Sequence, residues 1–371
     1  YDDLLYINQQ DGTFKESLNL YFEHTSNFGM GIDLADVNND GKPDLLQVDM
    51  LPEDNRRQKK LLSGMNYDRQ QMLLARGYLP QYMRNTLQLN TGKEKFQEIG
   101  YLAGISTTDW SWSPLIADLD NDGLKDIYIT NGYVKDVTDV DFRDYVVNET
   151  RKRNRVFDPQ VLIGALQDLK GEKVLNYAFR NTNGLQFSNV SEEWGITQPS
   201  FSTGAAYGDL DNDGDLDLVV NNLNDPSFLY ENMSSQKFKK NYLQIDFSID
   251  GNQQLAIGTK VVVALNSGEE LMAEVNPYRG FQSSVDPTVH LGLGESPSIK
   301  EVKVIWPDLS ESVLSDVKIN SRITVEKNKV EIKKSAPVAN VAQAFVDKAE
   351  GSVSQSQFGY FTDGERKIIY K

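Results

Sequence analysis

One nine-residue pattern recurs three times in the sequence and limits what the chain can fold into. The pattern, D-x-[DN]-x-D-G-x-x-D, begins at Asp36, Asp118 and Asp209. Each copy lies between two short apolar segments, as in "IADLDNDGLKDIYI", which indicates that a strand flanks each side of the acidic turn. Carboxylates at this density repel one another unless a cation holds them together. The sequence therefore predicts three β-hairpins, each closed by an acidic loop.

A second hairpin pattern accompanies the first. Segments 4–16, 86–100 and 177–191 each alternate strand, polar turn and strand, and each precedes an acidic loop. Four strands per repeated unit are typical of β-propeller blades. We therefore predict an all-β fold of blades, each with an outer hairpin followed by an acidic hairpin; a β-sandwich with coincidental acidic turns is the alternative. Three blades are too few to close a propeller, so we expect further blades upstream or a ring completed by the later β segments.

The pattern is interrupted and then replaced along the chain. We assign residues 1–240 to propeller blades, with helical insertions between blades at about 51–84 and 135–175, where apolar residues follow a helical spacing. Residues 241–328 alternate as a small antiparallel β domain without acidic loops. Residues 329–371 have the composition of a linker followed by the start of a further segment.

The spacing of the acidic loops suits calcium. Oxygen atoms at positions 1, 3, 5 and 9, together with the carbonyl at position 7, converge on one point, and calcium takes six to eight oxygen ligands. Magnesium demands a tighter octahedral geometry, and position 12 lacks the glutamate of an EF-hand. The predicted ligands of about three Ca²⁺ sites are Asp36, Asn38, Asp40, Asp44 and the Lys42 carbonyl; Asp118, Asp120, Asp122, Asp126 and the Leu124 carbonyl; and Asp209, Asp211, Asp213, Asp217 and the Asp215 carbonyl. The alternative is that Asp, Asn and Gly are simply good turn formers.

Charge and composition exclude several classes of function. The net charge of −16 argues against nucleic acid or an anionic membrane as the partner. The chain has no cysteine, so it holds no disulfide and no cysteine-based metal or haem site. No apolar run is long enough to span a membrane, and the sequence opens within a repeat, so any signal peptide would lie upstream.

The sequence offers little for catalysis. His290 lies in a strand-like segment where we expect a packed or hydrogen-bonded side chain, and His24 stands alone. No nucleophile elbow, zinc-protease helix, phosphate loop or dinucleotide fingerprint is present. Trp110, Trp112 and Tyr133 stand near the second acidic hairpin, where they form blade core or, if exposed, stack on sugars; core is the interpretation that we favour for the tryptophans.

The acidic hairpins resemble the FG-GAP, or VCBS-type, repeats of integrin-α-like propellers, and "TDWSWSPLIADLDNDG" (108–123) extends this resemblance. The segment from 241 to 328 resembles the ASPIC/UnbV domain of cartilage acidic protein and its relatives in Bacteroidota-type bacteria. Its matching motifs are "AIGTKVVV" (256–263), "RGFQSS" (279–284), "HLGLG" (290–294) and "VIWPD" (304–308). Leu309 departs from the glycine usual after "WPD". The resemblance implies calcium in the loops, an extracellular or outer-membrane-associated cell-surface location and a binding role.

Three functions are compatible with these observations. The first is a non-enzymatic, calcium-stabilised surface module that binds a protein or a glycan, as an accessory to outer-membrane nutrient uptake within a larger complex. The second is a polysaccharide-active, lyase-like enzyme built on a calcium-containing propeller; the absence of an evident Arg, Lys, His and Tyr cluster argues against it. The third is a structural spacer in a larger surface protein.

Overall fold

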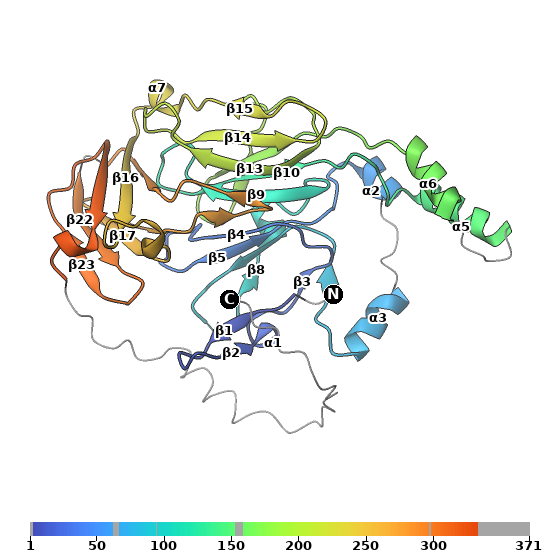
Figure 1. Ribbon diagram of the computed structural model, residues 1–371, viewed down its shortest axis with the longest axis horizontal. Coiled ribbons are helices and arrows are strands. Elements are labelled where there is room, and N and C mark those ends of the chain that lie inside the picture. The colour runs from blue at the N-terminus through green and yellow to red at the C-terminus, as the bar shows by residue number, and fades with distance from the viewer. Residues whose placement is uncertain (1–2, 62–66, 94, 153–158, 297, 333–371) are drawn as a thin grey trace. The chain divides into compact units, whose positions relative to one another are not determined.

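The computed structural model describes residues 3–61, 67–93, 95–152, 159–296 and 298–332. These residues fall within one compact unit, Tyr1–Lys334, while the second unit, Ser335–Lys371, lies outside the described residues, together with most of the segment predicted to be a linker. Strands dominate the described part of the chain (Figure 1), which confirms the predicted all-β class. No helix in that part is long and apolar enough to cross a membrane.

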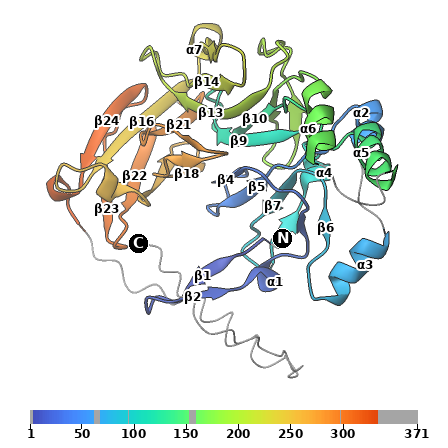
Figure 2. The ribbon, with the colours of Figure 1, turned by 45° about the vertical axis from the view of Figure 1, so that its right-hand side comes forward.

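Three antiparallel sheets repeat along the first part of the chain, and Figure 2 shows them next to one another. The first contains β4 (Ile32–Ala35), β5 (Asp44–Gln47), β7 (Thr86–Leu89) and β8 (Gln97–Glu98); the second contains β9 (Ser111–Ala117), β10 (Asp126–Asn131), β11 (Tyr177–Asn181) and β12 (Phe187–Asn189); the third contains β13 (Ser202–Gly208), β14 (Asp217–Asn222) and β15 (Phe228–Tyr230). In each sheet an acidic loop joins the first two strands. The predicted propeller blades are thus present as three successive sheets.

The order of the two hairpins within a blade differs from our prediction. The acidic hairpin comes first and the outer hairpin follows it, because β5 pairs with β7 and β10 pairs with β11. The earliest outer hairpin, β1 (Tyr6–Asn8) and β2 (Phe14–Glu16), forms a two-stranded sheet of its own. A repeat in sequence has no natural starting point, so periodicity alone cannot tell which neighbouring hairpin shares a sheet.

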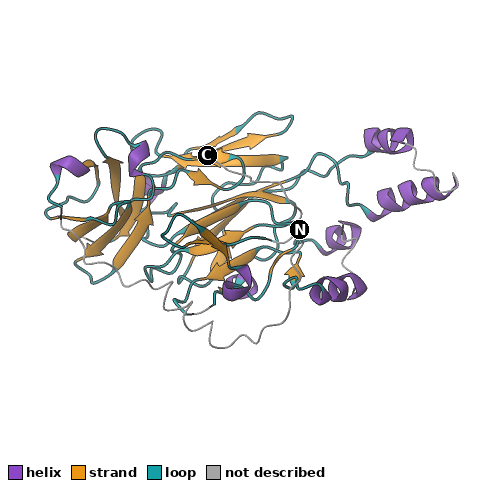
Figure 3. Cartoon of the chain, turned by 60° about the horizontal axis from the view of Figure 1, so that its bottom comes forward, coloured by secondary structure: helices purple, strands orange, loops and turns teal. Residues whose placement is uncertain are grey.

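The two helical insertions lie inside blades, between the second and third strands, and not between blades as predicted. The first carries α2 (Asn55–Leu61) and α3 (Tyr67–Ala75), and the second carries α5 (Val140–Lys152) and α6 (Pro159–Asp168). Figure 3 shows these helices together at one side of the strands. The two insertions are joined through the buried Arg57, whose guanidinium binds Asp109 at 2.6 and 2.9 Å and Glu172 at 3.1 Å.

Short elements complete the blade region. The strands β3 (Thr25–Ser26) and β6 (Gln81–Tyr82) form a small parallel pair. The short helices are α1 (Leu18–Tyr21), α4 (Gly100–Ala103) and α7 (Ser234–Lys237). Two apolar clusters fill the spaces between neighbouring sheets. One unites Leu46, Leu87 and Ile127 of the first and second blades, and the other unites Tyr128 and Val220 of the second and third.

The C-terminal β domain has two main sheets around one apolar core. One sheet contains β16 (Asn241–Ser248), β21 (Val289–Gly294) and β24 (Ser321–Glu326); the other contains β17 (Lys260–Leu265), β18 (Glu270–Glu274), β22 (Ile299–Ile305) and β23 (Glu311–Leu314). Two 3₁₀ turns, Gln254–Ala256 and Lys327–Lys329, lie in the connections. The domain is not fully antiparallel as predicted, because β24 runs parallel to β16. The turn after "WPD" places Leu309 at φ 65°, a conformation that favours glycine.

A small hairpin of this domain, β19 (Tyr278–Arg279) and β20 (Ser283–Ser284), contacts the first strand of all three blades. Its Gly280 exchanges backbone hydrogen bonds with Ile32 of β4. The Phe281 N–H donates to the Ser113 hydroxyl of β9, and the Ser283 hydroxyl accepts from Ala205 N–H of β13. The "RGFQSS" motif therefore ties the C-terminal domain to the inner edges of three blades.

One buried ion pair anchors this hairpin. Arg279 binds both carboxylate oxygens of Asp33 at 2.9 and 3.2 Å, and Asp33 is almost fully buried in β4. Asp33 also accepts the N–H of Ile116 in β9 at 2.7 Å, so the same carboxylate joins two blades to the C-terminal domain. Removal of one partner of a buried pair is costly because the other charge stays buried without compensation.

We expect Arg279→Ala to lower the free energy of unfolding by about 3–5 kcal/mol, because it leaves Asp33 buried and unpaired. The matched control is Arg322→Ala, which removes the more exposed pair with Asp246 and should cost about 1 kcal/mol or less. Urea denaturation of both variants measures the difference. Equal, small losses in the two variants would show that the pair does not anchor the hairpin.

Candidate metal sites on the acidic loops

The three acidic loops share one backbone conformation. The asparagine at position 4 and the glycine at position 6 have positive φ angles in every copy, which makes the chain turn sharply. These angles are 55° and 81° for Asn39 and Gly41, 60° and 92° for Asn121 and Gly123, and 64° and 92° for Asn212 and Gly214. Asparagine tolerates this region better than other side chains, and glycine adopts it without a steric penalty. The sequence pattern thus produces the same pair of positive φ angles in all three turns.

The first aspartate of each loop closes the turn from within. Its Oδ2 atom accepts the N–H of the position-6 glycine: Gly41 to Asp36 at 2.9 Å, Gly123 to Asp118 at 2.8 Å and Gly214 to Asp209 at 3.1 Å. The bond aligns the carboxylate with the interior of the loop. In the third loop the Oδ1 atom of the same aspartate is buried and has no hydrogen-bond partner in the described structure. A buried carboxylate oxygen without a donor is suited to a cation.

The ninth aspartate has a second role that the sequence pattern did not reveal. In every copy, one of its oxygens accepts an N–H within its own loop and the other accepts an N–H from the outer part of the blade. The pairs of donors are Val37 and Asn90 for Asp44, Leu119 and Asn181 for Asp126, and Leu210 and Asn232 for Asp217, at 2.7 to 3.0 Å. The carboxylate therefore ties the acidic hairpin to the chain that follows it. Its remaining lone pairs can still face a cation.

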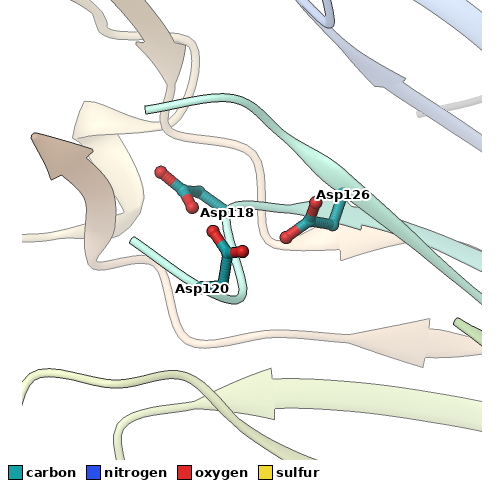
Figure 4. A group of neighbouring side chains, drawn as sticks. All are labelled: Asp118, Asp120 and Asp126. Atoms are coloured by element: carbon teal, nitrogen blue, oxygen red, sulfur yellow. The ribbon is translucent and has the colours of Figure 1, made fainter. Parts of the chain in front are cut away.

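Among the described residues, groups of three converging carboxylates occur in two of the three loops. Asp118, Asp120 and Asp126 offer oxygen atoms within 4.8 Å of one another, and Figure 4 shows the first two facing each other with the third beside them. A second group, whose oxygen atoms also lie within 4.8 Å of one another, is Asp209, Asp211 and Asp213, at positions 1, 3 and 5 and not 1, 3 and 9. Position 3 of the first loop is Asn38, an amide, so that loop supplies fewer charges. Asp122 lies in the second loop, where its Oδ1 atom accepts Leu124 N–H.

Burial and mutual repulsion raise the pKa values of these carboxyl groups. Burial, with the charges of Asp122 and Asp120, raises the pKa of Asp118 to about 7. Burial raises the pKa of Asp44 to about 6 and that of Asp126 well above its ordinary value. Carboxylates that are costly to ionise in a shared loop are stabilised by a nearby cation, which favours the charged form. The electrostatics of the loops thus favour a positively charged ligand.

Two protein cations already reach the second loop. Lys240 Nζ lies 3.0 Å from Asp120 Oδ1, and Arg180 Nε lies 3.2 Å from Asp120 Oδ2. They offset part of the negative charge of this loop. In the first loop Lys42 Nζ binds Asp40 at 3.1 Å, and in the third the Asp215 side chain accepts the N–H of Ser235 at 2.5 Å. The carbonyls of Lys42, Leu124 and Asp215 remain predicted ligands.

Neighbouring loops are linked by the asparagine at position 4. Asn39 Nδ2 donates to the Gly123 carbonyl at 2.8 Å, and Asn121 Nδ2 donates to the Gly214 carbonyl at 3.2 Å. Asn121 also donates to Asp215 Oδ1 at 2.8 Å. The recurrence of asparagine at position 4 was the available signal, but its spatial partner belongs to the next repeat and is invisible in sequence.

The aromatic residues near the second loop pack against one another. Trp110 is only 8% exposed and stacks on Tyr133 with ring centroids 4.5 Å apart, which confirms its expected place in the interior. Trp112 is half-buried, and its ring lies 4.8 Å from that of Phe281 in the C-terminal domain. The Trp112 indole N–H donates to the Gly132 carbonyl. The cluster holds the domain and the second blade together.

The histidines differ from each other in their surroundings. His290 is hydrogen-bonded to Asn121 at 2.7 Å, which confirms the expectation of a packed, hydrogen-bonded side chain. His24 does not stand alone: its Nε2 atom lies 3.2 Å from Glu98 Oε2 and 3.1 Å from the Arg84 guanidinium. The sequence reasoning missed this group, whose members come from segments about 60 to 75 residues apart.

Gly292 of β21 lies against the second acidic loop, and we expect Gly292→Ala to destabilise the protein by about 1–3 kcal/mol through overpacking. An added Cβ would clash with Asp118 and would lie 2.6 Å from the Asn121 backbone. The control is Gly164→Ala in α6, where a Cβ meets open space. Thermal denaturation compares the two; a neutral Gly292→Ala would contradict the close contact.

Comparison with family models agrees with this geometry. An FG-GAP-like repeat model matches residues 1–46, 71–129 and 158–220, which include all three acidic loops. A model described as ASPIC and UnbV matches residues 250–332, within the C-terminal β domain. No curated protein matches the chain. The chain is therefore an FG-GAP-like repeat protein that carries an ASPIC and UnbV domain after its repeats.

Proposed function

We propose that this protein is a non-enzymatic, calcium-stabilised module that binds a protein or a glycan outside the cell or at the cell surface. FG-GAP-like repeats are typical of extracellular and surface proteins, and this supports the location. The observation that carries the calcium assignment is the convergence of three carboxylates in each of two loops. By family analogy, the proposal extends to an accessory role in outer-membrane nutrient uptake.

The donor set fits calcium. All side-chain ligands proposed for the loops are carboxylates or an amide oxygen, and hard oxygen donors are what calcium prefers. Asp209 keeps one buried oxygen without a hydrogen-bond partner among the described residues, and burial together with neighbouring carboxylates raises the pKa of Asp118. A bound calcium ion would supply positive charge that offsets the repulsion among the carboxylates. The chain itself preorganises the loop through the positive-φ turn and the hydrogen bonds of the first and ninth aspartates.

The insertions are the proposed contact surface for a partner. In the described residues of α3, α5 and α6 no side chain is buried, and Tyr67, Tyr145 and Ile163 are exposed apolar groups. Helices with exposed apolar side chains favour a binding module over a passive spacer. The pocket beside α3 holds only about 20 Å³, so it is not a deep groove.

A second candidate function is a lyase-like enzyme acting on an acidic polysaccharide. The observation in its favour is a group of four side chains, His24, Arg84, Glu98 and Tyr82. This group contains a cation, an imidazole and a phenol, a combination that was not evident in the sequence. Arg84 binds Glu98 at 2.6 Å, and the His24 and Tyr82 rings lie 5.2 Å apart. An open pocket of about 620 Å³ adjoins His24 and Glu98.

Affinity electrophoresis separates these functions. The protein runs through gels containing acidic or neutral polysaccharides in millimolar calcium, and the same mixtures are assayed for new chain ends. Retardation without cleavage supports a glycan-binding module. Cleavage that His24→Ala abolishes supports the enzyme. If the protein is neither retarded nor active, the tested glycans are not its ligand. A protein partner is then sought by a pull-down in which this protein is the bait and cell-surface proteins are the sample.

Chelation should lower the melting temperature, because an ion that binds only the folded state stabilises it by mass action, by about 2.7 kcal/mol at 100 times the dissociation constant. Differential scanning calorimetry in calcium and in EDTA measures the shift, with magnesium as the competing cation. An identical melt in both solutions would refute the calcium assignment.

Asp213→Ala should remove about one calcium equivalent at concentrations that saturate the parent protein, because it deletes a charged ligand of the third loop. Isothermal titration measures stoichiometry and affinity. The control is Asp141→Ala, an exposed aspartate in the first turn of α5, which should leave binding unchanged. Parent-like binding by Asp213→Ala would show that the assigned ligands are wrong.

A further inference from the structure

The ASPIC and UnbV domain covers the second and third acidic loops directly. Gln244 in β16 donates from Nε2 to Asp209 Oδ2 at 2.8 Å, so a side chain of this domain reaches the first ligand of the third loop. Lys240, just before β16, reaches Asp120 of the second loop. The Gly294 N–H at the end of β21 donates to the Asn121 carbonyl at 3.0 Å. Two segments of the domain, and the lysine that immediately precedes it, therefore contact atoms of the two loops.

The contact requires close backbone approach on both sides. Gly292 leaves room for Asp118 and Asn121, since an added Cβ would clash with them. Gly214 of the third loop leaves room in the same way for the Tyr242 ring of β16. Such fits depend on the exact course of the loop backbone, so a change of loop conformation would displace the domain.

A series of hydrogen bonds crosses the interface between the C-terminal domain and the acidic loops, and each residue in it donates to the next. Burial lowers the pKa of His290 to about 4, so the imidazole is neutral and carries one N–H. The Asn121 amide donates to Asp215 Oδ1, which leaves its oxygen to accept from His290 Nε2–H at 2.7 Å. The other imidazole nitrogen, Nδ1, then faces Gln244 Nε2 at 3.5 Å as an acceptor. The network links the third loop to the second through the C-terminal domain.

We propose that docking of the ASPIC and UnbV domain and calcium binding by the second and third loops are thermodynamically linked, with Gln244 and His290 as positioning residues. This inference rests on the proposed calcium sites. Gln244, together with the Gly214 N–H, binds Asp209 Oδ2, which leaves Oδ1 for the ion; Oδ1 is buried and has no hydrogen-bond partner among the described residues. Residues that orient metal ligands in this way affect affinity without touching the metal.

The linkage is reciprocal. If the docked domain raises the calcium affinity of the loops, calcium must stabilise docking by the same factor. The hairpin β19–β20 gives a readout of docking that is remote from the second and third loops, because its Gly280 bonds with Ile32 of the first blade. Calcium should therefore protect this hairpin although no proposed ligand of these two loops belongs to it.

Hydrogen exchange and calorimetry on the whole chain test the inference. Calcium should slow amide exchange in peptides that cover Gly294 and, in the same titration, in the peptide that covers Gly280. Gln244→Leu removes the donor to Asp209; it should lower the affinity of one calcium site about tenfold and reduce the protection at Gly280. Gln253→Leu is the matched control, because Gln253 is an exposed glutamine of the same domain.

The outcomes separate this inference from the calcium proposal. Calcium binding with a raised melting temperature, but with unchanged exchange at Gly280 and parent-like affinity in Gln244→Leu, would overturn the linkage and leave the calcium sites standing. Absence of any calcium binding by the parent protein would overturn both. If Gln244→Leu does not fold, the exchange of the parent protein with and without calcium decides the question alone.

Discussion

The constraint on which this structure depends is the crowding of carboxylates at one end of each blade. Five or six acidic or amide side chains share each nine-residue turn, and the chain holds them together with backbone N–H groups. The ninth aspartate is the central element, because Asp44, Asp126 and Asp217 each accept one N–H from their own loop and one from the outer strands. This use of both oxygens joins the acidic hairpin to its blade. The raised pKa of Asp118 shows that hydrogen bonds leave some of the electrostatic cost uncompensated.

The same loops organise contacts beyond their own blade. Asn39 and Asn121 each donate a hydrogen bond to the next loop. The C-terminal domain reaches the loops through Gln244 and Gly294, and Lys240 reaches them from just before its first strand. The domain is also attached through Arg279, which binds Asp33 within β4. Repeats and domain are therefore one packed unit in which the acidic loops form part of the interface. A domain attached in this way is a structural partner of the propeller as well as its neighbour in sequence.

The insertions and the blades differ in how much of their side-chain surface is buried. The blades bury their side chains in two apolar clusters, whereas α3, α5 and α6 bury none among their described residues. Arg57 fixes the start of the first insertion to Asp109 of the second blade and Glu172 of the second insertion. Such helices contribute little to the core and much to the accessible surface. This contrast is the physical basis for our proposal that the insertions serve recognition and the loops serve stability.

The sequence by itself determined the repeats, the acidic hairpins, the residue ranges of the helical insertions and the family of both regions, because each depends on local spacing and residue type. The positive φ of Asn121 and Gly123 follows from the same local pattern. Only the tertiary structure decided which hairpin shares a sheet with which, that β24 runs parallel to β16, and that His24 meets Glu98 and Arg84. It also revealed the contact of Gln244 with Asp209. Each of these contacts joins residues that are far apart along the chain. The spacing of repeated residues in a sequence predicts local structure, but it does not predict which distant segments come into contact.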